Sequence, residues 1–477
     1  MAYALILIPL TAALLALIYP SDRGRPWIVT ASALAQTAAA LLALRAPRVT
    51  GLDGWLLLDA TGKLVLGVTT TVFLACALYL PGYLRLRSER PNRIFCMCLL
   101  TFYAMLTLIA ESHHLGLMWV ALEAATLSTA PLIYFNRNAH SLEATWKYLM
   151  VGSVGIALAL LGSLFLAYSQ LQASLTPTLL LDDVLRVAPQ LSKPWLHSAF
   201  VILFIGYGTK MGLAPMHTWK PDAYGEAPGV VGALLAGGLT NCAFLAILRF
   251  YRICVAAGEG AFARQLMLAF GLLSMTVAAT FMARQRDYKR MLAYSSVEHM
   301  GILVVGIGLG GAGIFGSLFH MINNGVTKVV LFLAAANIHR AYGSKHVADV
   351  SGALRRVPVS GALFLAGFLA ITGSPPFGPF LSEFTIVRQA FGSGRYGVGI
   401  AFLALLSVVF IGMGSAVISV VQGAPSEAAR ATTFRDDFST VAPIVLCLAI
   451  ALLLGLYLPP PLGRLLNEAT ASLGGTS

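Results

Sequence analysis

The stretch "SAFVILFIGYGTKMGLAPMHTW", residues 198–219, combines a membrane-like apolar run with two features that are unusual in lipid. Lys210 lies inside the run, and Pro215 follows five residues later. An ammonium is costly to bury in a membrane, and proline disrupts the interior of a helix. We therefore expect a membrane-spanning helix that is broken near Pro215 and carries a functional lysine beside the break.

The whole chain has the composition of a membrane protein. Of its 477 residues, 58% are hydrophobic and 11% are charged, and the mean hydropathy is +0.79, whereas soluble domains carry about 25% charged residues. The first 20 residues lack a positively charged segment and a convincing cleavage site. We expect them to form a retained helix rather than a signal peptide.

The pattern of special residues argues against several kinds of site. The six cysteines include no C-x-x-C pair, so the sequence predicts no metal site and no cofactor. No phosphate-binding glycine-rich loop of the ATPase type occurs. The formal charge of +12 comes from lysines and arginines in short loops, a pattern that is typical of membrane orientation and does not indicate nucleic-acid binding.

The apolar runs predict an all-α polytopic membrane protein with about fourteen transmembrane helices. They lie near residues 1–20, 27–45, 62–83, 94–111, 114–135, 144–169, 196–216, 229–254, 265–283, 289–309, 313–338, 358–391, 396–421 and 440–458. The seventh is interrupted near Pro215, and the twelfth at "GSPPFGP", Gly373–Pro379.

Broken helices in corresponding positions of two chain segments are typical of inverted repeats with a transport site at the breaks. Helices 7 and 12 are five apart, which predicts two repeats of five helices. The expected segments are residues 1–93 with helices 1–3, residues 94–254 with helices 4–8, residues 265–421 with helices 9–13, and residues 440–477 with helix 14 and the tail.

The distribution of basic residues predicts the orientation. Lysines and arginines are more frequent in the loops after odd-numbered helices, and Lys220, Arg284, Lys289 and Arg340 are among them. The positive-inside rule places these loops in the cytoplasm. Both termini are then expected on the outer side.

Four ionisable residues fall near the middle of predicted spans, namely Glu123, Lys210, Lys328 and Glu383. Such residues are functional candidates because a charge in the membrane is costly. Lys210 precedes the first break and Glu383 follows the second. A carboxylate that approaches or leaves a buried lysine would control whether the lysine holds its proton.

The stretch "HMINNGVTK" strengthens this interpretation. His320, Asn324 and Lys328 are spaced four and four, so they share one helix face and form a polar stripe of roughly 12 Å. An apolar packing face would not carry this pattern. The spacing favours a hydrated relay over incidental hydrogen bonds between helices.

Longer motifs resemble a known family. "KMGLAPMHTWKPDAYGEAP" is similar to the helix 7 signature of the antiporter-like subunits of respiratory complex I and of Mrp cation/proton antiporters, and "RQRDYKRMLAYSSVEHMG" resembles the start of helix 10 in that family. Within the family, "LEAATLSTAPL", "SLEATWKY", "LTNCAFLAILRFY", "SSVEHMG" and "FLSEF" resemble component F of hydrogenase-4, a membrane-arm subunit.

The resemblance implies a proton-transfer role for five residues. Glu123 matches the helix 5 glutamate that pairs with the helix 7 lysine, here Lys210. Lys328 matches the central lysine of helix 11, and Glu383 matches the charged position of helix 12. His320 matches the first histidine of an H-x-x-x-H stretch.

Two positions depart from the family pattern. Asn241 stands where helix 8 usually has lysine or histidine, and Asn324 replaces the second histidine of helix 11. Asparagine binds water but does not titrate. We therefore expect both residues to act as water-bridging polar groups.

The favoured hypothesis is a proton-translocating, antiporter-like subunit of a redox-driven complex in the bacterial inner membrane. Its expected partners are other membrane-arm subunits and a peripheral redox module of the [NiFe] hydrogenase type. The chain itself would be a non-redox subunit without a catalytic centre. Three alternatives stay open: an Mrp-type sodium/proton antiporter subunit, a proton-channel subunit of a carbon uptake complex, and a structural anchor that does not pump.

Overall fold

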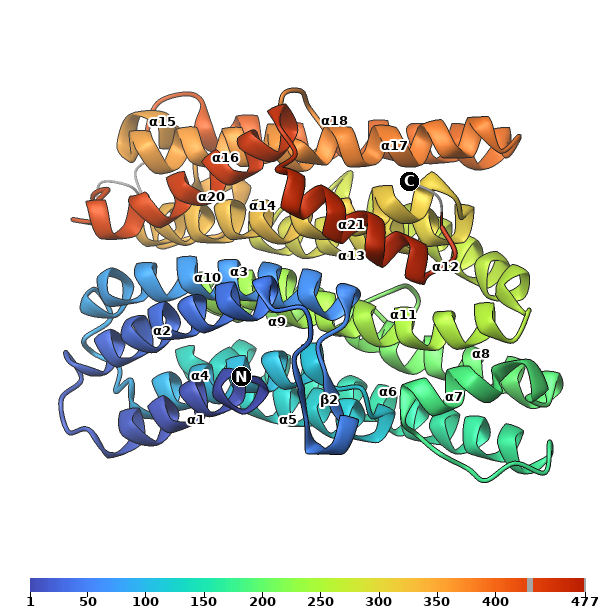
Figure 1. Cartoon of the computed structure of the whole chain (residues 1–477). Coiled ribbons are helices and arrows are strands. Elements are labelled where there is room, and N and C mark those ends of the chain that lie inside the picture. Colours follow the sequence, from blue (N-terminus) through green and yellow to red (C-terminus); the bar gives the residue numbers. More distant parts are fainter. Residues whose placement is uncertain (427–431, 476–477) are drawn as a thin grey trace.

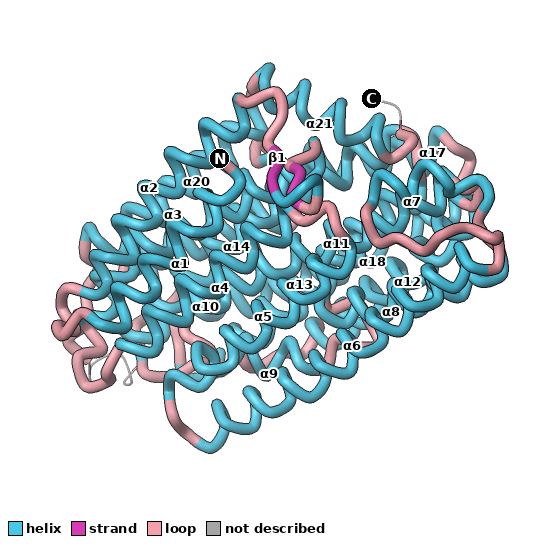
Figure 2. Tube along the Cα trace, turned by 60° about the horizontal axis from the view of Figure 1, so that its bottom comes forward, coloured by secondary structure: helices cyan, strands magenta, loops and turns pink. Residues whose placement is uncertain are grey.

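The computed structural model describes residues 1–426 and 432–475. Nearly all of this part of the chain is helical, and most of the helices run side by side (Figure 1). In that view the first half of the chain lies below the second half. The described residues contain one strand pair, in which β1 (Thr50–Gly51) lies antiparallel to β2 (Leu56–Leu57) (Figure 2).

The helices of the first half are α1 (Ala2–Ile18), α2 (Arg25–Arg45), α3 (Ala60–Arg85), α4 (Arg93–Glu111), α5 (Leu115–Ile133), α6 (Ala139–Leu171), α7 (Leu181–Val187), α8 (Lys193–Met211), α9 (Trp219–Glu226), α10 (Gly229–Leu234) and α11 (Thr240–Ala256). One π-helical segment, η4 (Leu235–Leu239), joins α10 to α11. The second half contains α12 (Gly260–Met282), α13 (Tyr288–Leu309), α14 (Ala312–Tyr342), α15 (Ala353–Arg356), α16 (Pro358–Ile371), α17 (Gly378–Gly392), α18 (Tyr396–Val421), α20 (Phe438–Leu456) and α21 (Pro460–Ser472).

Eleven helical segments in the described part of the chain are long and apolar enough to cross a membrane. The remaining predicted spans are the short α1 and the two interrupted pairs, α8 with α9 and α16 with α17. The prediction of an all-α polytopic membrane protein is therefore confirmed. The predicted tail contains the further helix α21, which packs against α3 and α14. Residues 476 and 477 of that predicted segment lie outside the described residues.

The spans differ in how much protein surrounds them. In the apolar stretch of α14 and in that of the joined α10–α11 segment, 100% of the residues are buried. In the apolar stretch of α18, only 33% of the residues are buried. Polar side chains on α14 are therefore enclosed by other helices and do not face lipid. This placement fits the rule that polar groups at membrane depth face protein or water.

Both predicted helix breaks are present. The first lies between α8 and α9, where Gly212 has a φ of +81°. The second lies between α16 and α17, where Gly373 has a φ of +67°. Glycine adopts this left-handed conformation without steric cost, which allows the chain to leave the helix sharply at each point.

Two lysines that the sequence placed in cytoplasmic loops are buried, so this part of the loop assignment is wrong. Lys220 lies in α9, which continues the broken helix inside the bundle. Lys289 lies in the first turn of α13 and donates hydrogen bonds to the carbonyls of Gly225 and Ala227, at 2.8 and 2.7 Å. Each ammonium turns inward because free carbonyls near a helix end need donors. The predicted side of the termini stays a prediction.

Close packing of α6 against α8 fixes the position of Lys210. A Cβ atom on Gly206 would lie 2.6 Å from the backbone nitrogen of Ala159 and 2.6 Å from the carbonyl oxygen of Gly155, so the two backbones touch there. Small residues permit this approach between membrane helices. Lys210 follows one turn after Gly206 and is therefore held against α6.

We expect Gly206→Ala to destabilise the protein, because the added methyl group meets backbone atoms that cannot move aside. Overpacking of this kind costs about 1–3 kcal/mol. Gly392→Ala is the matched control, since a Cβ atom there has no neighbour within 4 Å. Thermal unfolding of both variants in detergent tests this expectation, and equal melting temperatures would contradict the tight α6–α8 contact.

Candidate functional site

The first part of the site is a lysine–glutamate pair beside the first break. The Nζ atom of Lys210, in the last turn of α8, lies 3.6 Å from Oε2 of Glu123 on α5 and 2.5 Å from Oγ1 of Thr126. Lys210 is 1% exposed, whereas the Glu123 side chain is 23% exposed. The structure thus brings together the two residues that the sequence pairs, with the glutamate on the more accessible side.

Two side chains from α9 close the broken end of α8. The indole Nε1 of Trp219 donates a hydrogen bond to the carbonyl of Thr209, at 2.8 Å. The ammonium of Lys220 donates to the carbonyl of Met211, at 2.7 Å. A break in a membrane helix frees carbonyls that need donors from protein or water, and the residues just after the break supply two of them.

Lys220 also connects the two halves of the chain. Its Nζ atom donates to Oγ of Ser296 on α13, at 3.0 Å. The preceding residue, Ser295, accepts a hydrogen bond from Nζ of Lys328 on α14, at 2.8 Å. Two fully buried lysines from different halves are therefore anchored on adjacent hydroxyl groups of one helix.

A histidine pair follows on the same helices. His299 on α13 and His320 on α14 share a hydrogen bond, with 2.9 Å between Nδ1 of His299 and Nε2 of His320. Nδ1 of His320 lies 2.9 Å from Oγ of Ser382 on α17. Glu298 places its Oε2 atom 4.0 Å from Nε2 of His299. The predicted stripe on α14 thus meets both α13 and α17.

Glu383 lies at the second break. It is 5% exposed, and its Oε1 atom has no hydrogen-bond partner among the described residues. A Cβ atom on Gly373 would lie 2.1 Å from Oε2 of Glu383, so the carboxylate occupies the space beside this glycine. One carboxylate oxygen of Glu383, one ring nitrogen of His299 and one ring nitrogen of His320 all lie within 4.8 Å of one another.

The two predicted water-bridging residues are buried near Lys328. Nδ2 of Asn241 donates to the carbonyl of Gly237 in η4, at 2.8 Å, and lies 3.2 Å from where a Cβ atom of Gly325 on α14 would be. Oδ1 of Asn241 and both polar atoms of the Asn324 amide have no partner in the described part of the chain. Buried polar atoms of this kind normally bind ordered water.

Sequence reasoning missed three ionisable members of this arrangement, Lys220, Glu298 and His299. Glu298 and His299 were visible as polar residues inside a span, but their partners lie on other helices. The sequence gave one weak indication for Lys220, because the residue follows five positions after Pro215, where the break is predicted. We call the eight residues Glu123, Lys210, Lys220, Glu298, His299, His320, Lys328 and Glu383 the polar chain.

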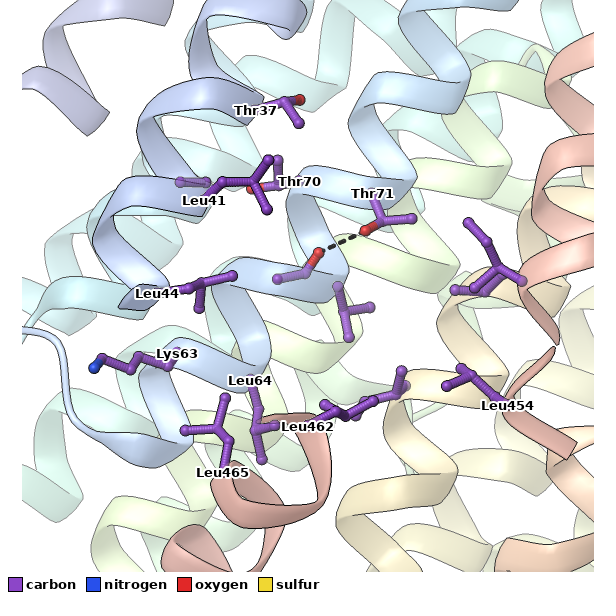
Figure 3. Close-up of a pocket in the computed structure, with 16 residues that line it drawn as sticks. Thr37, Leu41, Leu44, Lys63, Leu64, Thr70, Thr71, Leu454, Leu462 and Leu465 are labelled. Atoms are coloured by element: carbon purple, nitrogen blue, oxygen red, sulfur yellow. Dashed lines mark hydrogen bonds between the residues drawn. The ribbon is translucent and has the colours of Figure 1, made fainter. Parts of the chain in front are cut away.

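An apolar cavity of about 260 Å³ lies outside the polar chain, between α2, α3, α14, α20 and α21 (Figure 3). Leu41, Leu44 and Leu64 are among its walls. The ammonium of Lys63 donates to the carbonyl of Ala46, at 2.7 Å, and points away from the cavity in Figure 3. The cavity is therefore mainly apolar, and none of the residues of the polar chain is among those that line it.

Comparison with known proteins gives a consistent result. Residues 112–411 match the family described as NADH:quinone oxidoreductase/Mrp antiporter, transmembrane. The chain is 38% identical over 357 residues to a hydrogenase-4 component F homologue of Methylacidiphilum infernorum, covering 73% of each chain. It is 30% identical over 453 residues to NADH-quinone oxidoreductase subunit N of Desulforudis audaxviator, covering 90% of this chain and 88% of the relative.

The fold also matches a solved structure. A chain of the membrane-bound sulfane sulfur reductase, an archaeal respiratory membrane complex, superposes with a TM-score of 0.88 at 20% identity. The match covers 99% of this chain and 97% of that chain. At this identity the likeness shows the fold alone.

We expect Trp219→Phe to lower stability by about 0.5–1.5 kcal/mol, because it removes the indole donor to the Thr209 carbonyl at the break. Trp146→Phe is the control, since Trp146 is 59% exposed. Thermal unfolding in detergent compares the two. A Trp219→Phe variant as stable as the control would show that the indole hydrogen bond does not hold the break.

Proposed function

The chain belongs to the family of NADH:quinone oxidoreductase/Mrp antiporter membrane subunits, and from this premise we propose that it translocates protons as a subunit of a redox-driven membrane complex. The observation that carries the proposal is the polar chain. Its ionisable groups, all buried except the partly exposed Glu123, extend from Glu123 in the first half to Glu383 beside the second helix break. Relatives named as hydrogenase-4 and NADH-quinone oxidoreductase subunits support this class of complex.

The pair of Glu123 and Lys210 forms the control point. While the carboxylate stays within 3.6 Å, the ion pair favours a protonated Lys210. Movement of Glu123 away from α8 removes this stabilisation, and the buried ammonium of Lys210 then releases its proton to the next groups of the polar chain. Thr126, at 2.5 Å, holds the lysine in place in either state.

Lys220 and Lys328 carry the proton between the halves. Asn241 cannot titrate, so α11 offers no protonatable group at the position where the family usually has one. Lys220 supplies the missing step because it reaches Ser296 while Lys328 reaches Ser295. Water bound by Asn241 and Asn324 completes the connection to Lys328.

The final part of the path runs through the histidine pair to Glu383. Each imidazole accepts a proton on one nitrogen and releases one from the other, so His299 and His320 transfer a proton along their shared hydrogen bond. Glu383, beside the second break, exchanges protons with the half-channel on its side. The two breaks supply the local hydration, as in other transporters with interrupted helices.

We assign the redox chemistry to partner subunits. The proposed partners are other membrane-arm subunits and a peripheral module of the [NiFe] hydrogenase type, in a bacterial inner membrane with both termini outside. The proposed architecture divides the bundle into two inverted repeats, residues 94–254 and 265–421. Each repeat contains one of the observed breaks.

Lys210→Arg and Glu123→Gln are both expected to reduce proton pumping at least about tenfold. Arginine keeps its proton, so it cannot act as a switch, and glutamine cannot pair with an ammonium by charge. Proton uptake by vesicles that contain the whole complex measures the effect. Full pumping by Lys210→Arg would show that only a fixed positive charge is required, and the proton-switch role would be wrong.

Two substitutions, Lys220→Met and Lys220→Arg, test whether Lys220 transfers protons or only supports the helix break. Arginine retains donors for the Met211 carbonyl but not a releasable proton, so we expect both variants to lose pumping. Lys147→Met is the control, because Lys147 is 47% exposed and pairs with Glu143 and Asp222. Normal pumping by Lys220→Arg, at normal levels of assembled complex, would limit Lys220 to a structural role.

A further inference from the structure

His299, His320 and Glu383 form a cluster whose composition suggests more than proton transfer. They come from three separate helices, α13, α14 and α17, and all three are buried. One possible ligand atom from each lies within 4.8 Å of the other two. The cysteine pattern gave no sign of this arrangement, because its members are far apart in sequence.

We propose that this cluster binds one divalent transition-metal ion with the ligand preference of Zn²⁺, and that the bound ion blocks proton transfer. Two imidazole nitrogens and one carboxylate oxygen form a ligand set that zinc takes in sites with an open fourth position. Ligands at about 2.0–2.2 Å from zinc lie roughly 3.3 Å apart in a tetrahedral site. The two imidazole nitrogens are 2.9 Å apart, and the three possible ligand atoms lie within 4.8 Å of one another, so rotation of the side chains has to bring the carboxylate closer to the imidazoles.

The hydrogen bonds around His320 direct the lone pair of its ligating nitrogen toward His299. The hydroxyl of Ser382 donates to the carbonyl of Pro379, at 2.8 Å. It therefore accepts from Nδ1–H of His320, at 2.9 Å. In this tautomer Nε2 of His320 carries a lone pair and accepts a hydrogen bond from Nδ1–H of His299. When a metal ion binds, this proton leaves Nδ1 of His299, and the Nε2 atom of the same ring, 4.0 Å from Oε2 of Glu298, takes it. An outer partner that fixes the tautomer in this way is typical of metal-binding histidines.

Two further observations favour a cation at this place. Oε1 of Glu383 is buried without a hydrogen-bond partner in the described part of the chain. The carboxylate of Glu298 lies 4.0 Å from Nε2 of His299. A dication would thus be coordinated by one carboxylate and have a second one near the other nitrogen of His299, which helps to offset the cost of burying its charge.

The blocking effect rests on the proposed function, whereas the binding does not. A metal ion at the cluster occupies the lone pairs of His299 and His320 that transfer the proton. It also crosslinks α13, α14 and α17. Proton transfer between Lys328 and Glu383 then stops until the ion leaves.

Titration of the detergent-purified full-length chain with Co²⁺ tests the binding, because four-coordinate Co²⁺ gives visible absorption bands. We expect one Co²⁺ per chain, displaced by Zn²⁺. His299→Gln and Glu383→Gln should weaken binding at least tenfold, and Ser382→Ala, which removes the outer partner, by about 10–100-fold. His197→Gln is the matched control, since His197 forms a more accessible contact with Glu259, at 2.7 Å between Nε2 and Oε2.

The absence of a saturable site, or equal affinity in His299→Gln and His197→Gln, would overturn the proposal. In vesicles that contain the whole complex, Zn²⁺ should inhibit proton uptake by the wild-type protein. Stoichiometric binding without inhibition would contradict the blocking role. The spectra do not depend on pumping, so failure of the metal site and failure of the proposed function are distinguishable.

Discussion

The polar chain depends on two hydrogen bonds that Lys220 donates. One ammonium satisfies the last carbonyl of α8 and, at the same time, binds Ser296 on α13. The first bond makes a broken helix tolerable inside a membrane protein, since free carbonyls there need donors. The second places the broken end of the first half directly beside the central helix of the second half. Without this lysine, the broken end of α8 would lose both a donor for its last carbonyl and its link to α13, and the proposed mechanism requires both.

The cost of burying charge explains why the polar chain lies where it does. Ionisable groups in a membrane face the bundle interior or water. His320 and Lys328 lie on α14, and the apolar stretch of this helix is completely buried. Each of the three lysines of the polar chain has a hydroxyl partner. Lys210 contacts Thr126, Lys220 contacts Ser296 and Lys328 contacts Ser295. Asn241 and Asn324 have polar side-chain atoms without a hydrogen-bond partner among the described residues. Hydroxyl groups thus hold the titratable side chains, and the amides provide places for water between them.

Much of the fold followed from the sequence, because span positions depend on local hydropathy and breaks depend on proline and glycine. The spacing of His320, Asn324 and Lys328 correctly indicated one buried helix face, since four-residue steps repeat on a helix. Lys220 could not be placed in this way. A count of basic residues treats a lysine outside an apolar run as a loop residue, and only the tertiary structure shows that α9 lies inside the bundle. The contacts of Glu298 and His299 likewise depend on helices distant in sequence.

In the proposed mechanism, protons cross from one half of the chain to the other through Lys328. Proton uptake by vesicles containing the whole complex, measured together with redox turnover, tests it most directly in the variant Lys328→Ala. The proposed mechanism predicts that electron transfer and assembly persist while proton uptake through this subunit is lost. Wild-type proton uptake per electron in Lys328→Ala would contradict the mechanism and remove Lys328 from the path.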